Sequence, residues 1–237
     1  MRKSIPVFTV QQYPELTKHL AEEGHEIGNH GWSHTYPDNM DGYEAEKKEY
    51  LDCSDIVEKV TGVRPKGYRS PAWEFSPHTI NILEDMPEIE YSSNMMDADR
   101  IKYLKAGGRE SKLVELPVQW VLDDAAYWLY SLRTPGKAIQ SLESVEYYWR
   151  SEFDALLEEF LEETEEKGDS DICFVLTCHP QIIGHPARMK MLERLVCHML
   201  ETRNAAFLTG GEAAGRFKAK HPKREADRRA GEHPGKS

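Results

Sequence analysis

Apolar and polar positions change period along the chain, and this pattern predicts short strands that alternate with helices. Residues 5–10 and 25–29 are short β-rich runs, and the residues between them have helical spacing up to Gly24. The same rhythm predicts helices at 43–62, 76–86, 144–167 and 188–202, and strands at 64–73, 89–95, 113–124, 171–180 and 205–210. Such alternation favours an α/β fold with a mostly parallel sheet.

The length of 237 residues fits one α/β domain, which we expect to span residues 1–215. From residue 216 to residue 237 the chain is polar, basic and rich in breakers. Because this segment lacks the apolar surface that offsets the entropy of ordering, it is predicted to be a disordered basic tail.

Composition narrows the classes of partner. The formal net charge of −11 argues against a surface that neutralises phosphates, and so against nucleic acid as a partner. No apolar run approaches the ~20 residues of a membrane span, and the first residues do not resemble a secretory signal, so we expect a cytoplasmic protein without a membrane partner. The four cysteines are scattered, which favours neither a disulfide framework nor a cysteine zinc site.

Side chains capable of chemistry follow several of the predicted strands directly. In parallel sheets the carboxyl ends of the strands meet at one face, so these groups are expected to converge. They are His30 and His34 after residues 25–29, Arg69 and Trp73 after 66–68, Asp123 and Asp124 after 117–122, and His179 after 173–178.

The spacing of His30 and His34 predicts two imidazoles on the same side of a helical turn, close enough to share one metal ion. The alternative for this motif alone is one histidine in the core and one on the surface. Small and apolar neighbours such as Gly28 and Gly31 allow close packing around a partly buried site.

His179 and Arg69 each have a functional and a structural interpretation. His179 precedes Pro180 at the end of a predicted strand, where it would act as a general acid or, alternatively, as a cap or a packed core group. Arg69 stands near Pro71 and Trp73, which favours the anchoring of a carboxylate inside the site over a structural ion pair.

Four ordered motifs, GHEIGNHGWSH, YRSPAW, LPVQWVLDD and LTCHPQIIGHPARMKMLERLV, resemble those of the polysaccharide deacetylase superfamily (carbohydrate esterase family 4). The resemblance spans roughly residues 5–210 and is strongest to the peptidoglycan deacetylase-like and allantoinase-like branch. It implies a distorted (β/α) barrel and a metal-dependent hydrolase of carbon–nitrogen bonds other than peptide bonds. The implied reaction removes acetyl from N-acetylated sugars of a polysaccharide such as peptidoglycan or chitin.

The resemblance also implies roles for individual residues. A divalent metal, zinc above all, would bind to His30 and His34, and His179 would be the catalytic acid. Arg69 would hold a catalytic aspartate. The substrate would be bound by Trp73, Trp120, Asp123 and Asp124.

One motif of the family has no counterpart here. Family members open with a strand that bears an aspartate pair, a general base and a third metal ligand, yet only six residues precede Val7 and the first aspartate is Asp38. We therefore expect a barrel without its first strand. Two explanations stay open: the sequence is a piece of an active deacetylase, or it has lost this unit and hydrolyses slowly or not at all.

Two other functions remain as alternatives: a small-molecule ureide or amide hydrolase of the allantoinase-like type, and an inactive carbohydrate-binding relative. The expected partner is an N-acetylated carbohydrate or a small amide. The sequence leaves open whether the chain forms a homo-oligomer.

Overall fold

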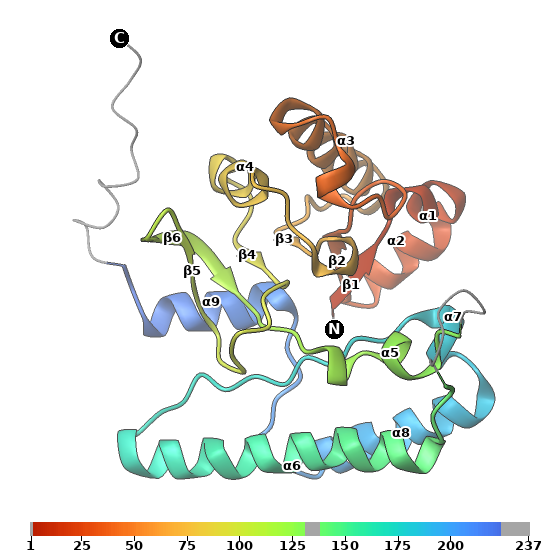
Figure 1. The fold of residues 1–237 in the computed structure, drawn as a ribbon, viewed down its shortest axis with the longest axis vertical. Coiled ribbons are helices and arrows are strands. Elements are labelled where there is room, and N and C mark those ends of the chain that lie inside the picture. Colours follow the sequence, from red (N-terminus) through yellow and green to blue (C-terminus); the bar gives the residue numbers. More distant parts are fainter. Residues whose placement is uncertain (1, 131–137, 224–237) are drawn as a thin grey trace. The chain divides into compact units, whose positions relative to one another are not determined.

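The computed structural model describes residues 2–130 and 138–223, which form two compact units (Figure 1). The first unit comprises Met1–Met95, Ile101–Leu116 and Leu208–Ser237, and the second comprises Met96–Arg100 and Pro117–Phe207. The domain predicted at residues 1–215 thus contains residues of both units.

The first unit contains a six-stranded sheet with the order β1-β2-β3-β4-β6-β5. The first five strands in this order are parallel, and β5 pairs antiparallel with β6, so the expected α/β class is confirmed. Asn29 at the end of β2 pairs with Tyr68 at the end of β3, which brings the segments after these two strands together. The strands are β1 (Arg2–Ile5), β2 (Glu26–Asn29), β3 (Gly67–Tyr68), β4 (Tyr91–Ser92), β5 (Lys102–Ala106) and β6 (Arg109–Glu115).

The helices of the first unit are α1 (Val7–Gln12), α2 (Pro14–Glu22), α3 (Tyr43–Thr61), α4 (Thr79–Asp85) and α9 (Gly210–Lys220). The prediction of a strand at residues 5–10 is wrong, because the strand is β1 and residues 7–12 form α1. Val7 and Val10, three residues apart, are both fully buried against α3 residues, so packing overrides the strand propensity of this run.

The strand predicted at residues 205–210 is wrong, because residues 205–209 form neither a strand nor a helix and α9 begins at Gly210. Helix α9 extends into the predicted tail, since residues 216–220 are helical. Thr209 and Glu212 form a capping box at its start, and Ala214 and Phe217 are buried in a core cluster with Tyr91. A Cβ atom at Gly210 would overlap the Tyr91 ring, so glycine lets the helix approach β4 closely. Residues 224–237 of the predicted tail lie outside the described residues.

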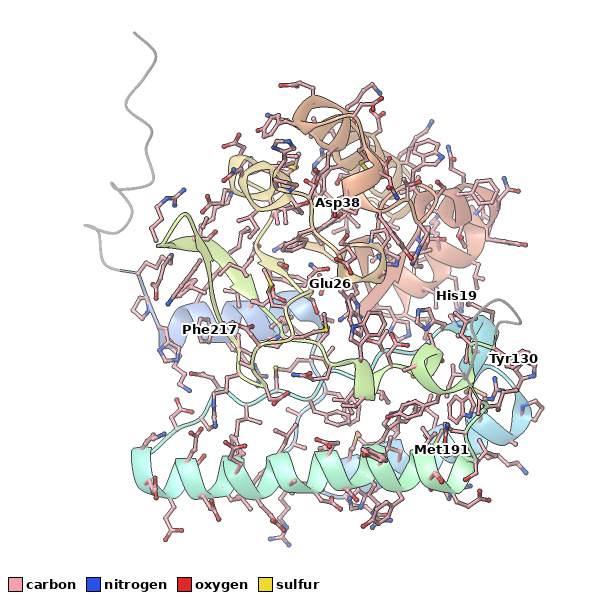
Figure 2. All side chains as sticks on the ribbon, viewed as in Figure 1. His19, Glu26, Asp38, Tyr130, Met191 and Phe217 are labelled. Atoms are coloured by element: carbon pink, nitrogen blue, oxygen red, sulfur yellow. The ribbon has the colours of Figure 1, made fainter. Side chains whose placement is uncertain are left out.

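The second unit is built from α5 (Asp124–Trp128), α6 (Leu142–Lys167), α7 (Pro180–Ile183) and α8 (Pro186–Leu200). Helices α6 and α8 lie side by side, and Met191 of α8 belongs to the core between them (Figures 1 and 2). Within the described residues, no helix combines the length and the apolar character needed to span a membrane.

Two further strand predictions need correction. The run at 113–124 is not one strand: β6 ends at Glu115, and Trp120–Leu122 form a 3-10 turn. Residues 171–180 are half-buried and make only isolated bridges, between Ile172 and Arg100 and between Thr177 and Asp123. Their β-branched and apolar residues suit an extended chain, but tertiary context decides whether such a chain joins a regular ladder.

Candidate active site

His30 and His34 lie close together in a turn that directly follows β2, which we call the histidine turn (residues 30–34). Their ring centroids are 5.1 Å apart, and the rings meet edge to face at 83°. The predicted helical turn is wrong, because Gly31 and His34 adopt left-handed φ angles of 70° and 64° that no α-helix contains. The two imidazoles are nevertheless adjacent, as a shared ion requires.

A backbone carbonyl fixes the tautomer of His30. Its Nδ1 atom lies 2.6 Å from the carbonyl oxygen of Arg69, and a carbonyl oxygen only accepts hydrogen bonds, so Nδ1 carries the proton. The lone pair of the neutral ring is then on Nε2. This is the arrangement that metal-binding histidines use, in which one ring nitrogen donates to a carbonyl and the other faces the ion.

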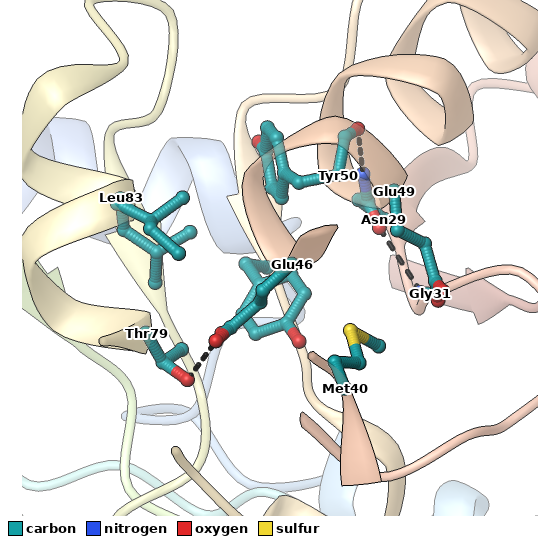
Figure 3. A pocket seen from close by; sticks show the side chains of 10 residues that line it. Asn29, Gly31, Met40, Glu46, Glu49, Tyr50, Thr79 and Leu83 are labelled. Carbon is teal, nitrogen blue, oxygen red and sulfur yellow. Dashed lines mark hydrogen bonds between the residues drawn. The ribbon is translucent and has the colours of Figure 1, made fainter. Parts of the chain in front are cut away.

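Polar side chains of β2 and α3 form hydrogen bonds with the backbone of the histidine turn. Asn29 is fully buried; its Oδ1 accepts from the Gly31 N–H at 3.0 Å, and its Nδ2 donates to the Tyr50 carbonyl and the Ser54 hydroxyl of α3. The carboxylate of Glu49 accepts from the Trp32 N–H at 2.9 Å. Figure 3 shows Asn29, Gly31 and Glu49 beside one small pocket.

That pocket is small and partly open to solvent, and it lies between α3 and α4. Glu46 lies on its wall and accepts a hydrogen bond from the Thr79 hydroxyl at 2.5 Å. Burial raises the pKa of the Tyr50 and Tyr68 phenols, which also line it, so both stay protonated at neutral pH. The pocket wall therefore contains two neutral phenols and the Glu46 carboxylate, which already accepts a hydrogen bond from Thr79.

The segment after β3 places Arg69 next to the histidine turn and contains strained backbone. The Arg69 guanidinium donates to Ser93 through Nε at 3.2 Å and through Nη2 at 2.7 Å. Ala72 and Trp73 have φ angles of 51° and 62°. Together with His34 they are the non-glycine residues with positive φ in the described chain, so this strain is confined to the two candidate motifs of the first unit.

Trp73 and Trp120 differ in exposure. Trp73 was expected to form a groove wall, but only 7% of its surface is accessible. Trp120 is 44% exposed and lies in a turn that two other aromatics hold, since the Val121 carbonyl accepts from the Tyr127 hydroxyl and from the Trp149 indole. Trp120 is therefore the better surface for stacking on a sugar ring.

In the second unit, His179 is bound to Asp124. Its Nδ1 lies 2.6 Å from Asp124 Oδ1, and its backbone N–H donates to Asp124 Oδ2 at 2.9 Å. The Asp124 carboxylate is fully buried, and 32% of the His179 side chain is accessible. Because a carboxylate only accepts, Nδ1 carries a proton and Nε2 is the atom available for proton exchange.

The two aspartates expected to bind substrate are both buried and hydrogen-bonded within the second unit. Asp124 has both oxygens on His179, and Asp123, 3% exposed, caps α5 through a 2.6 Å bond from the Ala125 N–H. Both side chains are buried because they serve backbone and imidazole donors. We therefore assign Asp124 to the positioning of His179.

The donor set fits a divalent ion in part. His30 and His34 would supply two imidazole ligands, whereas catalytic zinc sites use three protein ligands and a water. In residues 2–130 and 138–223, the group of three candidate ligands found within 4.8 Å of one another is Asp123, Asp124 and His179, which does not include the two histidines. His30 and His34 therefore fit as two members of a larger ligand set.

Sequence reasoning missed the residues that support these groups. Asn29 ends β2, a strand that also contains Glu26, so a polar residue at this point was not a distinctive signal in the sequence. Asn94, whose Oδ1 accepts from the Ser70 N–H at 2.7 Å, and Glu49 gave no signal, since each acts on a segment far away in the sequence.

Comparisons with known proteins concern the family and the fold of this chain. The family model described as polysaccharide deacetylase matches residues 5–88. The chain is 24% identical over 247 residues to the peptidoglycan deacetylase of Helicobacter pylori, which covers 93% of this chain and 79% of that protein.

Solved structures show the same fold. The crystal structure of a Mycobacterium smegmatis protein assigned to the polysaccharide deacetylases has a TM-score of 0.78 and 29% identity, covering 92% of this chain and 72% of that one. Puue allantoinase also has a TM-score of 0.78, at 20% identity, covering 94% and 69%, and this likeness concerns the fold alone. The expected fold class is confirmed, with a sheet that β1 and β5 leave open at its edges within the described residues.

Proposed function

We propose that this chain, which belongs to the polysaccharide deacetylase superfamily, is a metal-dependent hydrolase that removes acetyl groups from the N-acetylated sugars of a polysaccharide such as peptidoglycan or chitin. The observation that carries this proposal is the pair of adjacent imidazoles, one of them oriented by the Arg69 carbonyl. The likeness to a peptidoglycan deacetylase supports the choice of substrate.

His30 and His34 would hold the ion, for which two imidazole nitrogens favour zinc. A bound divalent ion supplies a Lewis acid for the amide carbonyl and lowers the pKa of water towards about 7. The strained backbone at His34, Ala72 and Trp73 supports this role, because such strain persists where the surrounding structure holds a site in a fixed geometry.

His179 would deliver a proton to the amine as the carbon–nitrogen bond breaks. Its Nδ1–H is held by Asp124, so the proton that is transferred is the one on Nε2. The buried carboxylate keeps the ring in one orientation and stabilises the imidazolium. Asp124 acts on this step only through His179.

Trp120 would stack on a sugar ring of the substrate, since its exposed indole lies three residues before Asp123 and four before Asp124. Arg69 would orient the site through its carbonyl, which bonds His30, and through its guanidinium, which bonds Ser93. The predicted cytoplasmic location stays a prediction.

Acetate release tests this function. The chain, loaded with zinc, is incubated with N-acetylglucosamine oligomers and with peptidoglycan, and acetate is measured beside a sample treated with a chelator. We expect release that the chelator stops and added zinc restores, and we expect His179→Ala to lose it while still binding zinc. No release from either substrate by the zinc-bound chain would contradict the proposal, and turnover of a cyclic ureide instead would favour the amide-hydrolase alternative.

A further inference from the structure

Trp32 lies midway between His30 and His34, and its backbone N–H is held by a side chain from a distant helix. Glu49, in the middle of α3, accepts this N–H at 2.9 Å through Oε1. The histidine turn belongs to no helix or strand, so ladder hydrogen bonds do not define its shape. A carboxylate that accepts a backbone N–H makes one of the stronger hydrogen bonds in proteins.

Three other backbone groups of the turn have partners on different elements. The Gly31 N–H is held by Asn29, and the carbonyls of Gly31 and Trp32 accept from the N–H groups of Val7 and Phe8 at the start of α1. A Cβ atom at Gly31 would lie 3.2 Å from Glu49 Oε1, so the turn and the carboxylate are in close contact. Glu49 thus provides a hydrogen bond between α3 and the part of the turn between the two histidines, where Trp32 also packs against the core cluster that contains Cys53 and Val57.

From these contacts we propose that Glu49 is a positioning residue that sets the relative placement of His30 and His34, and hence the affinity for a divalent cation. This inference rests on the proposed function. His30 donates to the Arg69 carbonyl, and His34 follows Trp32 by two residues and has a strained φ of 64°. Releasing the Trp32 N–H would let His34 move away from His30 without unfolding the unit.

Cobalt binding tests this role, because Co²⁺ reports both affinity and ligand geometry through its visible absorbance. We expect Glu49→Ala to weaken Co²⁺ binding by about tenfold and to change the spectrum, as is usual for groups that orient metal ligands. Glu49→Gln keeps an oxygen that accepts the same N–H, so its affinity should stay within about twofold of the parent. Glu44→Ala removes an exposed carboxylate from the same helix and should leave both readouts unchanged.

Amide hydrogen exchange at Trp32 in the metal-free chain gives an independent readout, and we expect protection to be lost in Glu49→Ala and kept in Glu49→Gln. Equal Co²⁺ affinity and spectra in the parent and Glu49→Ala would overturn the positioning role and leave the proposed function standing. If Glu49→Gln failed to restore the affinity, the role of the hydrogen bond would be overturned as well. A parent chain that binds no Co²⁺ would overturn the metal-dependent function, and this inference with it.

Discussion

The histidine turn of the first unit accepts hydrogen bonds from α1 and donates them to α3 and to the segment after β3, whereas the imidazole of His179 in the second unit lies 2.6 Å from Asp124 and 3.8 Å from Asp123. The turn must keep two rings at a fixed separation, and its backbone has left-handed residues that are stable only when several neighbours hold them. His179 needs a proton on a defined nitrogen, and its Nδ1–H is held by the Asp124 carboxylate. The proposed ligand pair is therefore supported from several elements of the first unit, and the proposed proton donor is supported by neighbouring carboxylates of the second unit.

The largest expected effect concerns the hydrogen bonds between His179 and Asp124. Asp124→Asn should lower turnover by about 10²- to 10⁴-fold, because the amide has one accepting oxygen and must give up either the ring or the backbone N–H of His179. Zinc affinity, measured by calorimetry, should not change. The matched control is Asp154→Asn, since Asp154 pairs with His198 at the same distance of 2.6 Å between α6 and α8. A similar loss in both variants would mean that Asp124 has no special role.

A smaller effect is expected where many contacts hold the turn. Asn29→Ala leaves the Gly31 N–H and the Ser54 hydroxyl without their partner in a buried place, which should lower the free energy of unfolding by about 2–3 kcal/mol. Urea unfolding measures this change. Asn81→Ala, on the exposed side of α4, should stay within about 0.5 kcal/mol of the parent. If Asn29→Ala were as mild as Asn81→Ala, Asn29 would not support the turn.

Helix α9 offers a comparison within the first unit. Gly210→Ala should destabilise the chain by about 2 kcal/mol, because the new methyl group overlaps the Tyr91 ring. Gly215→Ala meets no atom within 4 Å and lies inside the same helix, so it should stabilise the chain by about 0.5–1 kcal/mol. Thermal unfolding of the two variants should therefore shift in opposite directions, and a shift in the same direction would show that α9 does not pack as described.

The smallest effect concerns alkaline pH. Burial, and after it the nearby Glu49 and Asp52 carboxylates, raise the pKa of the Cys53 thiol to about 12, from 9.0 in the unfolded chain. Between these values the folded chain keeps a proton that the unfolded chain loses, so the free energy of unfolding falls as pH rises above about 9. Cys53→Ala should reduce this slope by about 1 kcal/mol between pH 9 and pH 10. Cys197→Ala, at an exposed position, is the control and should keep the slope of the parent, and an equal slope in Cys53→Ala would contradict the assignment.

The sequence predicted most helices and the strands that end at His30 and Arg69, because amphipathic spacing and glycine stops are local signals. It failed at residues 7–10, where burial of two valines turned a β-rich run into a helix, and at residues 171–180, where an extended segment does not join a ladder. The adjacency of His30 and His34 was predicted, but through the wrong local geometry. Asp124 and His179 lie 55 residues apart, and Glu49 supports a turn in another part of the sequence. Both contacts depend on tertiary structure, so no local sequence pattern predicts them.

The most direct test of the central claim is calorimetric titration of zinc into the parent chain, His30→Ala and His19→Ala. His19 is an exposed histidine of α2 (Figure 2), so its variant removes one imidazole without touching the histidine turn. We predict that the parent and His19→Ala bind zinc with equal affinity and that His30→Ala loses tight binding. Equal affinities in all three proteins would contradict the assignment of His30 and His34 as metal ligands.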